Sequence, residues 1–180
     1  MIPKILVVGI LLIHQSQGQP PQQQITKAVA CFNIGNEKSG VNGVLEIYQD
    51  PSGSAVYITG QISGLQPNTV HGFHVHQFGD VRQGCDSLGG HFNPWNQSHG
   101  GPWDYARHVG DLGNIKADAT GQATVNIWDS LISLNGVNSI VGRGFAIHEK
   151  EDDLGRGSNP ESRMNGNSGP RIACGIIGVL

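Results

Sequence analysis

Short stretches of alternating hydrophobic and polar residues, separated by turn residues, dominate this chain. The alternation is clearest over residues 44–48 and 123–127 and is typical of a β-strand with one face on a core. Turn sequences such as Asp-Pro-Ser-Gly at 50–53 and Asp-Ala-Thr-Gly at 118–121 divide the stretches. The pattern predicts strands over residues 25–32, 43–48, 55–62, 70–76, 113–117, 123–128, 142–148 and 171–179. No long amphipathic helix is predicted, so the chain is expected to be all-β, an antiparallel sandwich or barrel.

Two long segments interrupt the strand pattern. Residues 78–109 and 149–170 are rich in glycine and have no strand periodicity. Loops longer than about 15 residues are uncommon unless they are functional or disordered. Because the first segment carries several histidines and the second follows one directly, we interpret both as ordered, functional loops on a rigid sheet.

The N-terminus has the features of a secretory signal peptide. Lys4 precedes an apolar run over residues 5–13, and small residues at 16–18 suit a signal peptidase. The apolar run is too short to cross a membrane, and the alternative is a buried strand or helix. We predict a signal peptide at 1–18, a flexible leader with the start of the first strand at 19–27, and secretion without membrane attachment after cleavage.

Composition narrows the class of protein further. The chain has 180 residues, 27 of them glycine, and a formal net charge of −3. This length predicts one domain, over residues 28–180, with room for a hydrophobic core. The mildly acidic charge argues against a nucleic-acid partner, which a basic face would indicate.

The chain has three cysteines, so in an oxidising compartment one is left unpaired. We pair Cys85, in a glycine-rich loop, with Cys174, near the C-terminus. Cys31 lies in an alternating run and is expected to be a small buried hydrophobic residue.

Histidines at characteristic spacings predict a metal centre. His74 and His76 are two apart in a predicted strand, so their side chains project from the same face. His148 ends another strand and can complete a set with them. The alternative is a pair of solvent-facing histidines.

A second group comes from the first long loop and the residues after it. Three imidazole nitrogens and one carboxylate make a closed tetrahedral set that suits zinc. The alternative, an ordinary polar loop, explains the spacing poorly. The members of the group are His91, His99, His108 and Asp111.

Six motifs resemble those of copper/zinc superoxide dismutases, and the resemblance covers nearly all of the chain after residue 28. They are Gly-Phe-His-Val-His-Gln-Phe-Gly-Asp (72–80), Gly-His-Phe-Asn-Pro (90–94), His-Gly-Gly-Pro (99–102), Arg-His-Val-Gly-Asp-Leu-Gly-Asn (107–114), His-Glu-Lys-Glu-Asp-Asp-Leu-Gly (148–155) and Arg-Ile-Ala-Cys-Gly-Ile-Ile-Gly (171–178). The resemblance implies an eight-stranded antiparallel Greek-key β-barrel or sandwich with two long functional loops.

The resemblance also implies a role for each ligand. Copper would be held by His74, His76, His91 and His148, and zinc by His91, His99, His108 and Asp111, with His91 bridging the two ions. Asp152 would link His74 to His99 through its carboxylate. Arg171 and His91 would be the catalytic residues, Arg171 by guiding superoxide and His91 by handling a proton. Cys85 and Cys174 would form the disulfide bond, and His71 would be structural.

The implied function is that of a secreted enzyme that converts superoxide to oxygen and hydrogen peroxide by one-electron cycling of copper. Zinc has no redox chemistry, whereas copper does. The alternative is a non-catalytic extracellular protein that binds copper and zinc on the same fold. The resemblance further implies a homodimer, with Phe78-Gly79 and the C-terminal Ile177-Gly178-Val179 at its contact, and copper supplied in the secretory pathway.

Three residues near the implied channel depart from the family pattern: Pro160, Met164 and Asn165 stand where an acid, a lysine and a threonine are common. Arg171 and Lys150 remain as candidate steering cations, so we expect near-normal catalysis with a shallower dependence on salt. Asn96 begins an Asn-Gln-Ser glycosylation sequon. His99 follows the sequon directly and is an expected metal ligand. A tight loop around it would argue against glycosylation of Asn96.

Overall fold

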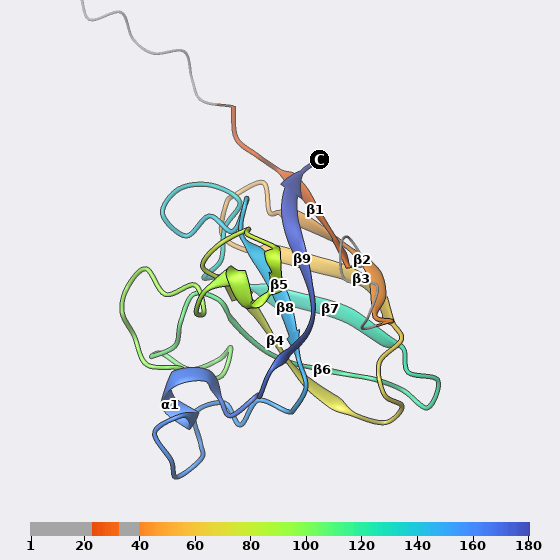
Figure 1. Ribbon diagram of the computed structural model, residues 1–180. Helices are drawn as coiled ribbons and strands as arrows, with labels where there is room; N and C mark the ends of the chain where they lie inside the picture. Colours follow the sequence, from red (N-terminus) through yellow and green to blue (C-terminus); the bar gives the residue numbers. More distant parts are fainter. Residues whose placement is uncertain (1–22, 33–39) are drawn as a thin grey trace, which may run out of the picture.

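The computed structural model describes residues 23–32 and 40–180, so the predicted signal peptide lies outside the described residues. The described part of the chain forms nine strands, one 3-10 helix and one short α-helix (Figure 1). The elements are β1 (Lys27–Phe32), β2 (Asn42–Gln49), β3 (Val56–Ser63), β4 (Val70–His76), β5 (Arg82–Cys85), η1 (Asp86–Leu88), β6 (Asp111–Lys116), β7 (Ala123–Asp129), β8 (Gly144–His148), α1 (Ser162–Asn165) and β9 (Arg171–Val179).

Eight of these strands form one antiparallel sheet in the order β6-β4-β8-β9-β1-β2-β3-β7. Its edge strands β6 and β7 lie side by side without a hydrogen-bonded ladder, so the sheet curls into a nearly closed barrel. Several neighbours, such as β1 with β9 and β4 with β8, are far apart in sequence, as expected of a Greek-key arrangement. The prediction of an all-β, eight-stranded antiparallel barrel is confirmed.

The eight predicted strands correspond to the eight strands of the barrel, with small differences at their ends. β6 begins at Asp111, two residues before the predicted start, and β8 begins at Gly144 rather than at residue 142. Gly142 has a φ of 76°, a turn conformation that suits glycine. The short elements β5, η1 and α1 lie within the two long loops and were not predicted, because none is long enough to show a periodicity.

The barrel interior holds the hydrophobic core. Alternating residues of the strands point inward, among them the fully buried Leu45, Ile47 and Ile58. Phe73 of β4 and Phe145 of β8 stack with ring centroids 5.0 Å apart. This core holds β4 and β8 rigidly side by side, and both strands carry predicted metal ligands.

The predicted disulfide between Cys85 and Cys174 is present, with a Cα–Cα distance of 5.7 Å. The prediction for Cys31 is wrong in one respect, because its side chain is free but only half-buried. Ala30 and Phe32 take the inward positions of β1, so Cys31 faces outward, next to the exposed Val44 of β2.

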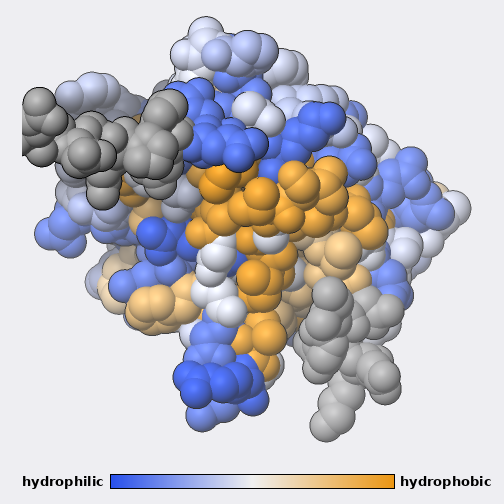
Figure 2. Space-filling model, turned by 90° about the horizontal axis from the view of Figure 1, so that it is seen from above, coloured by the Kyte–Doolittle hydropathy of each residue, from blue (hydrophilic) through white to orange (hydrophobic). Residues whose placement is uncertain are grey.

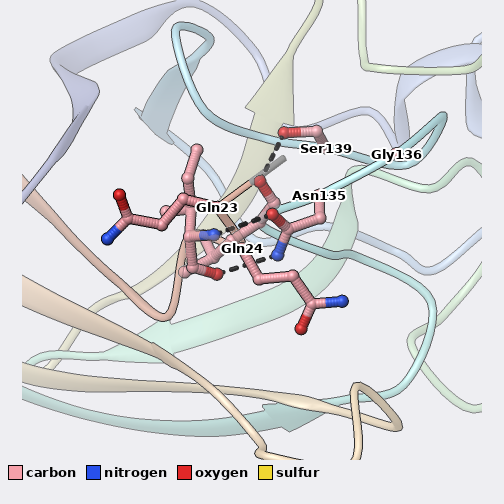
Figure 3. Close-up of a pocket in the computed structure, with 7 residues that line it drawn as sticks. Gln23, Gln24, Asn135, Gly136 and Ser139 are labelled. Atoms are coloured by element: carbon pink, nitrogen blue, oxygen red, sulfur yellow. Dashed lines mark hydrogen bonds between the residues drawn. The ribbon is translucent and has the colours of Figure 1, made fainter. Parts of the chain in front are cut away.

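A side-chain amide anchors the chain just before β1. Asn135 accepts a hydrogen bond from Ile25 N at 2.9 Å and donates one to Ile25 O at 2.8 Å, as a paired strand would (Figure 3). The pair borders a cavity of about 350 Å³. β1 therefore begins at Lys27, because residue 25 is bound to the loop that carries Asn135 rather than to β2. Among the described residues, no helix has the length and apolar character needed to span a bilayer.

Candidate metal centre

Three histidines of the first predicted set come together from β4 and the end of β8. His74 and His76 are both buried on β4, and β8 pairs with β4 in an antiparallel register that ends near His148. The Nε2 atoms of His76 and His148 lie 3.2 Å apart. His91 joins them from the first loop, so that one ligand atom from each of the four residues lies within 4.8 Å of the others.

Hydrogen bonds on the outer side of the rings orient three of these imidazoles. His74 Nε2 lies 2.8 Å from Asp152 Oδ2, His76 Nδ1 lies 2.9 Å from Gly89 O, and His148 Nδ1 lies 2.9 Å from Gly169 O. Each acceptor requires a proton on the outer nitrogen, which leaves the lone pair of the inner nitrogen free for a metal. The inner atoms are Nδ1 of His74 and Nε2 of the other two.

The second group also converges on one point. Asp111 Oδ1 lies 2.8 Å from His91 Nδ1, 3.0 Å from His99 Nδ1 and 3.1 Å from His108 Nδ1. The Nδ1 atoms of His91 and His108 are 3.3 Å apart. In tetrahedral coordination with zinc–nitrogen bonds of the usual length, neighbouring ligand atoms are about 3.3 Å apart. The four atoms therefore have close to the spacing of a zinc site.

His91 belongs to both groups. Its Nδ1 lies in the set around Asp111, whereas its Nε2 is buried and has no hydrogen-bond partner. Its ring centroid is 4.1 Å from that of His74 and 5.3 Å from that of His99. The ring is thus placed to join the two sets with one nitrogen in each.

Orphaned polar atoms provide a test of whether metals fit here. Buried nitrogens are rarely without a hydrogen bond, yet three such atoms gather in this site: His74 Nδ1, His91 Nε2 and His99 Nδ1. His99 Nδ1 is close to Asp111 Oδ1, but the two atoms lack hydrogen-bond geometry. Each orphaned atom belongs to one of the two sets, so the donor residues fit two metal ions.

The electrostatics of the metal-free site favour metal-binding forms for most of the ligands. Burial lowers the pKa of His74 to about 3 and that of His148 to about 4, so both imidazoles are neutral at pH 7. Burial alone would raise the pKa of Asp111, but the adjacent imidazoles of His108, His91 and His99 hold the pKa well below its usual range. Neutral imidazoles and ionised carboxylates are the species that bind metals.

His99 is the exception among the ligands. Burial alone would lower its pKa, but the nearby carboxylates of Asp111 and Asp152 raise the pKa to about 9. A protonated His99 would have to lose a proton before it could bind zinc.

Asp152 links the two groups as expected. Its Oδ1 lies 2.8 Å from His99 Nε2, and its Oδ2 lies 2.8 Å from His74 Nε2. Asn114 of β6 holds the Asp152 backbone, accepting from its N–H at 2.8 Å and donating to its carbonyl at 2.9 Å. The sequence analysis missed Asn114, because nothing in its local sequence indicates that partner.

A buried ion pair holds the loop before β6 to the barrel. Arg107 donates to Asp129 Oδ2 at 2.6 Å and to the backbone carbonyl of Asp111 at 2.6 Å. Asp129 in turn accepts from the backbone of Leu131 and Ile132. The sequence analysis did not assign this pair either, since its members are separated by β6 and β7.

An open cavity of about 450 Å³ leads to the first group and is lined by His76, His91, His148 and Arg171, with Met164 and Asn165 at its rim. Arg171 donates to Cys85 O at 2.8 Å, to Asp86 O at 3.0 Å and to Gly89 O. The disulfide-bonded loop therefore positions the guanidinium. Lys150 and Pro160 are exposed and do not line this cavity, so Arg171 is its one lining cation among the described residues.

The chain is similar to known proteins over most of its length. A family model described as "Copper/zinc superoxide dismutase (SODC)" matches residues 41–177. The chain is 51% identical over 140 residues to superoxide dismutase (Cu-Zn) 5 of Dictyostelium discoideum, covering 78% of this chain and 91% of that protein. It is 40% identical over 184 residues to the extracellular superoxide dismutase (Cu-Zn) of Haemonchus contortus, covering 100% and 99%. Among solved structures, the clock protein EA4 matches with a TM-score of 0.82 and 41% identity, over 88% of this chain and 97% of that one.

Proposed function

Because the chain belongs to the copper/zinc superoxide dismutase family, we propose that it is a secreted, catalytically active member that uses the two histidine groups described above. Copper and zinc are the cofactors of this family and superoxide is its substrate. In this proposal copper is held by His74, His76, His91 and His148, and zinc by His91, His99, His108 and Asp111.

The observation that carries the proposal is the position of His91. Its two ring nitrogens belong to different ligand sets, and its side chain is only 4% exposed. A protein that only binds two metal ions can do so with two separate ligand sets. One imidazole shared between the sets couples the state of one metal site to that of the other. The alternative, a non-catalytic binder of copper and zinc, gives no reason for a shared ring.

The protein's own residues then perform three tasks. Bound copper supplies the one-electron chemistry that superoxide dismutation requires, and bound zinc polarises the shared imidazole. Arg171 attracts the superoxide anion into the cavity, since it places a positive charge at the wall beside His148. His91 Nε2 can hold a proton whenever it is not a ligand, close to where the product must be protonated. Asp152 keeps the rings of His74 and His99 oriented throughout.

Pulse radiolysis of the mature protein loaded with copper and zinc tests this proposal. We expect superoxide to decay at a copper-dependent rate near the diffusional limit, which the handful of fastest enzymes reach. A rate no better than that of buffer, with both metals bound, would support the non-catalytic binder instead.

Secretion is part of the proposal and rests on three features. Residues 1–18 have the pattern of a signal peptide, the chain carries a disulfide bond, and the Haemonchus relative is named extracellular. We propose that copper is acquired in the secretory pathway. Expression in a secreting cell should release a protein whose N-terminus lies near residue 19; retention of residues 1–18 would contradict this.

Asn96 is proposed as a glycosylation site of the secreted protein. Asn96 and Ser98 are both exposed, and the Asn96 side chain makes no hydrogen bond among the described residues. A glycan would therefore project into solvent although His99 is buried three residues on. Treatment with an N-glycosidase should lower the mass of the secreted wild type and leave that of Asn96→Gln unchanged; no shift in either rejects the site.

A homodimer is proposed through the face that contains the C-terminus. Viewed from that end, hydrophobic side chains gather at the centre of the surface (Figure 2). Phe78, Val179 and Leu180 are each at least 50% exposed, and the backbone of Gly79 packs against Gly142 and Ile176. Such an exposed apolar patch is typical of a protein interface. Sedimentation analysis should give a dimer for the wild type and a folded monomer for Phe78→Glu; a wild-type monomer contradicts the proposal.

A further inference from the structure

The seam between the two edge strands of the barrel carries an aromatic groove that contains none of the candidate metal ligands. β6 and β7 lie side by side there without a ladder of hydrogen bonds. A cavity of about 470 Å³ opens at this seam and is lined by Trp103, Trp128, Asn126, Asn114, Pro102 and Leu154, among others. It shares no lining residue with the cavity beside Arg171.

Two of the chain's three tryptophans line this groove, and both are exposed. Trp103 is 88% exposed and Trp128 is 59% exposed. Trp103 also lines a second hollow of about 240 Å³, shared with Ala55 and Ser130. Pro102, Trp103 and Trp128 line both hollows, so the two hollows adjoin. Exposed indole rings keep apolar surface in contact with water, and burying that surface against a ligand is favourable. We therefore expect this surface to bind a ligand.

The Trp128 ring is held in place before any ligand arrives. It stacks on Tyr57 with ring centroids 4.6 Å apart and an interplanar angle of 24°. The hydroxyls of Tyr57 and Thr59 donate to Asn126 Oδ1 at 2.8 and 3.0 Å. These bonds fix the amide of Asn126, whose Nδ2 has no protein partner among the described residues. The result is a rigid aromatic surface with an amide donor beside it.

The chemistry of the lining selects the kind of ligand. None of the described residues that line the larger hollow is charged, and the one carboxylate of the smaller hollow, Asp129, is paired with Arg107. A neutral groove complements a neutral ligand and gives no advantage to sulfated or sialylated chains. A pyranose ring matches both features, because its apolar C–H face packs on an indole while its hydroxyls bond to amides.

We propose that the groove between Trp103 and Trp128 binds a neutral carbohydrate chain, with one sugar ring in each hollow. Asn114 lines the groove and also holds the backbone of Asp152, but the groove contains no candidate metal ligand, so the proposal does not depend on the function of the metal centre. The groove would tether the protein to neutral glycans and leave the dismutase chemistry unchanged.

Titration of the intact, metal-loaded protein with neutral trisaccharides of N-acetylglucosamine, glucose and mannose tests the proposal by tryptophan fluorescence and calorimetry. We expect saturable, salt-independent binding of at least one of them. Trp103→Ala should weaken it by about tenfold or more, as removal of a central aromatic contact does. Trp128→Ala is the second variant. Trp95→Ala is the matched control, since Trp95 is 52% exposed but lies outside the groove.

Several results would overturn the proposal. The first is the absence of saturable binding to any of the three sugars. A second is equal loss of binding in Trp95→Ala. A third is self-association that Trp103→Ala abolishes in the absence of sugar binding, which would make the groove an interface between copies. Saturable binding of an uncharged apolar peptide, together with no binding of any sugar, would assign the groove to a peptide instead.

Discussion

Arg107 and Asp129 form an ion pair with an N–O distance of 2.6 Å and side chains only 4% and 3% exposed. Arg107 also donates to the backbone carbonyl of Asp111, so the pair connects the loop that carries the second candidate ligand group to the end of β7. This contact fixes the loop before β6, which has little secondary structure of its own, to a strand of the barrel.

Asp129→Asn should destabilise the protein strongly. It leaves the Arg107 charge buried without a counter-ion, and breaking a buried pair costs about 3–5 kcal/mol. Denaturant unfolding of the metal-free protein measures the change in the free energy of unfolding. Asp80→Asn is the control, because the Arg82–Asp80 pair has an Arg82 side chain that is 88% exposed and should contribute little to stability. Equal effects of the two substitutions would mean that the buried pair has no special role.

Asp152→Asn should weaken zinc binding by about 10–100-fold, the usual effect of losing an outer partner of a ligand. In asparagine one of the two oxygens is replaced by a donor nitrogen, so only one imidazole keeps its acceptor, whereas the carboxylate accepts hydrogen bonds from both His74 and His99. Competition with a chelator measures the affinity. Glu151→Gln, at an exposed neighbouring position, serves as the control and should bind zinc like the wild type. Unchanged affinity in Asp152→Asn would contradict the orienting role.

Replacement of Cys85 and Cys174 by serine should lower the free energy of unfolding on the order of 4–5 kcal/mol in the chain-entropy description, given the separation of 89 residues. It should also reduce the dismutation rate, because the loop that begins at Cys85 holds Arg171 through three backbone carbonyls. Urea unfolding and pulse radiolysis of the same sample measure both effects. A variant with lower stability but a full rate at full copper content would show that Arg171 is positioned without the disulfide bond.

Arg171→Ala should lower kcat/KM by about tenfold or more, because it removes the lining cation that attracts superoxide. Copper content should stay the same, as Arg171 bonds to backbone carbonyls and to no histidine. Arg82→Ala, which removes an exposed arginine outside this cavity, controls for the change in net charge. An equal loss in the control would point to net charge rather than to a local effect.

Met164→Lys should raise the rate at low ionic strength and make its dependence on salt steeper. Met164 is 65% exposed at the rim of the cavity, so a lysine there adds a positive charge on the path of the anion. Screening by salt would then remove more of the rate than in the wild type. Stopped-flow assays from low to high ionic strength compare the two proteins. A wild-type rate that already falls steeply with salt would contradict the shallow dependence expected for this chain.

The local sequence determined the strands and singled out the candidate metal ligands. Alternation in segments such as 44–48 and 123–127 reports which side of a strand faces the core, because the side-chain period of a strand is two. The same rule placed His74 and His76 on one face. Only elements too short for a period, such as β5 and α1, were missed.

The tertiary structure decided which distant groups meet. The pairing of β4 with β8 brings His76 to His148, and folding of the first loop inserts His91 between the two ligand sets. The Arg107–Asp129 pair, the hold of Asn114 on Asp152 and the groove at the β6–β7 seam likewise join residues separated by whole strands. Local periodicity reports burial at each position but not its partner, since the partner depends on how the sheet closes.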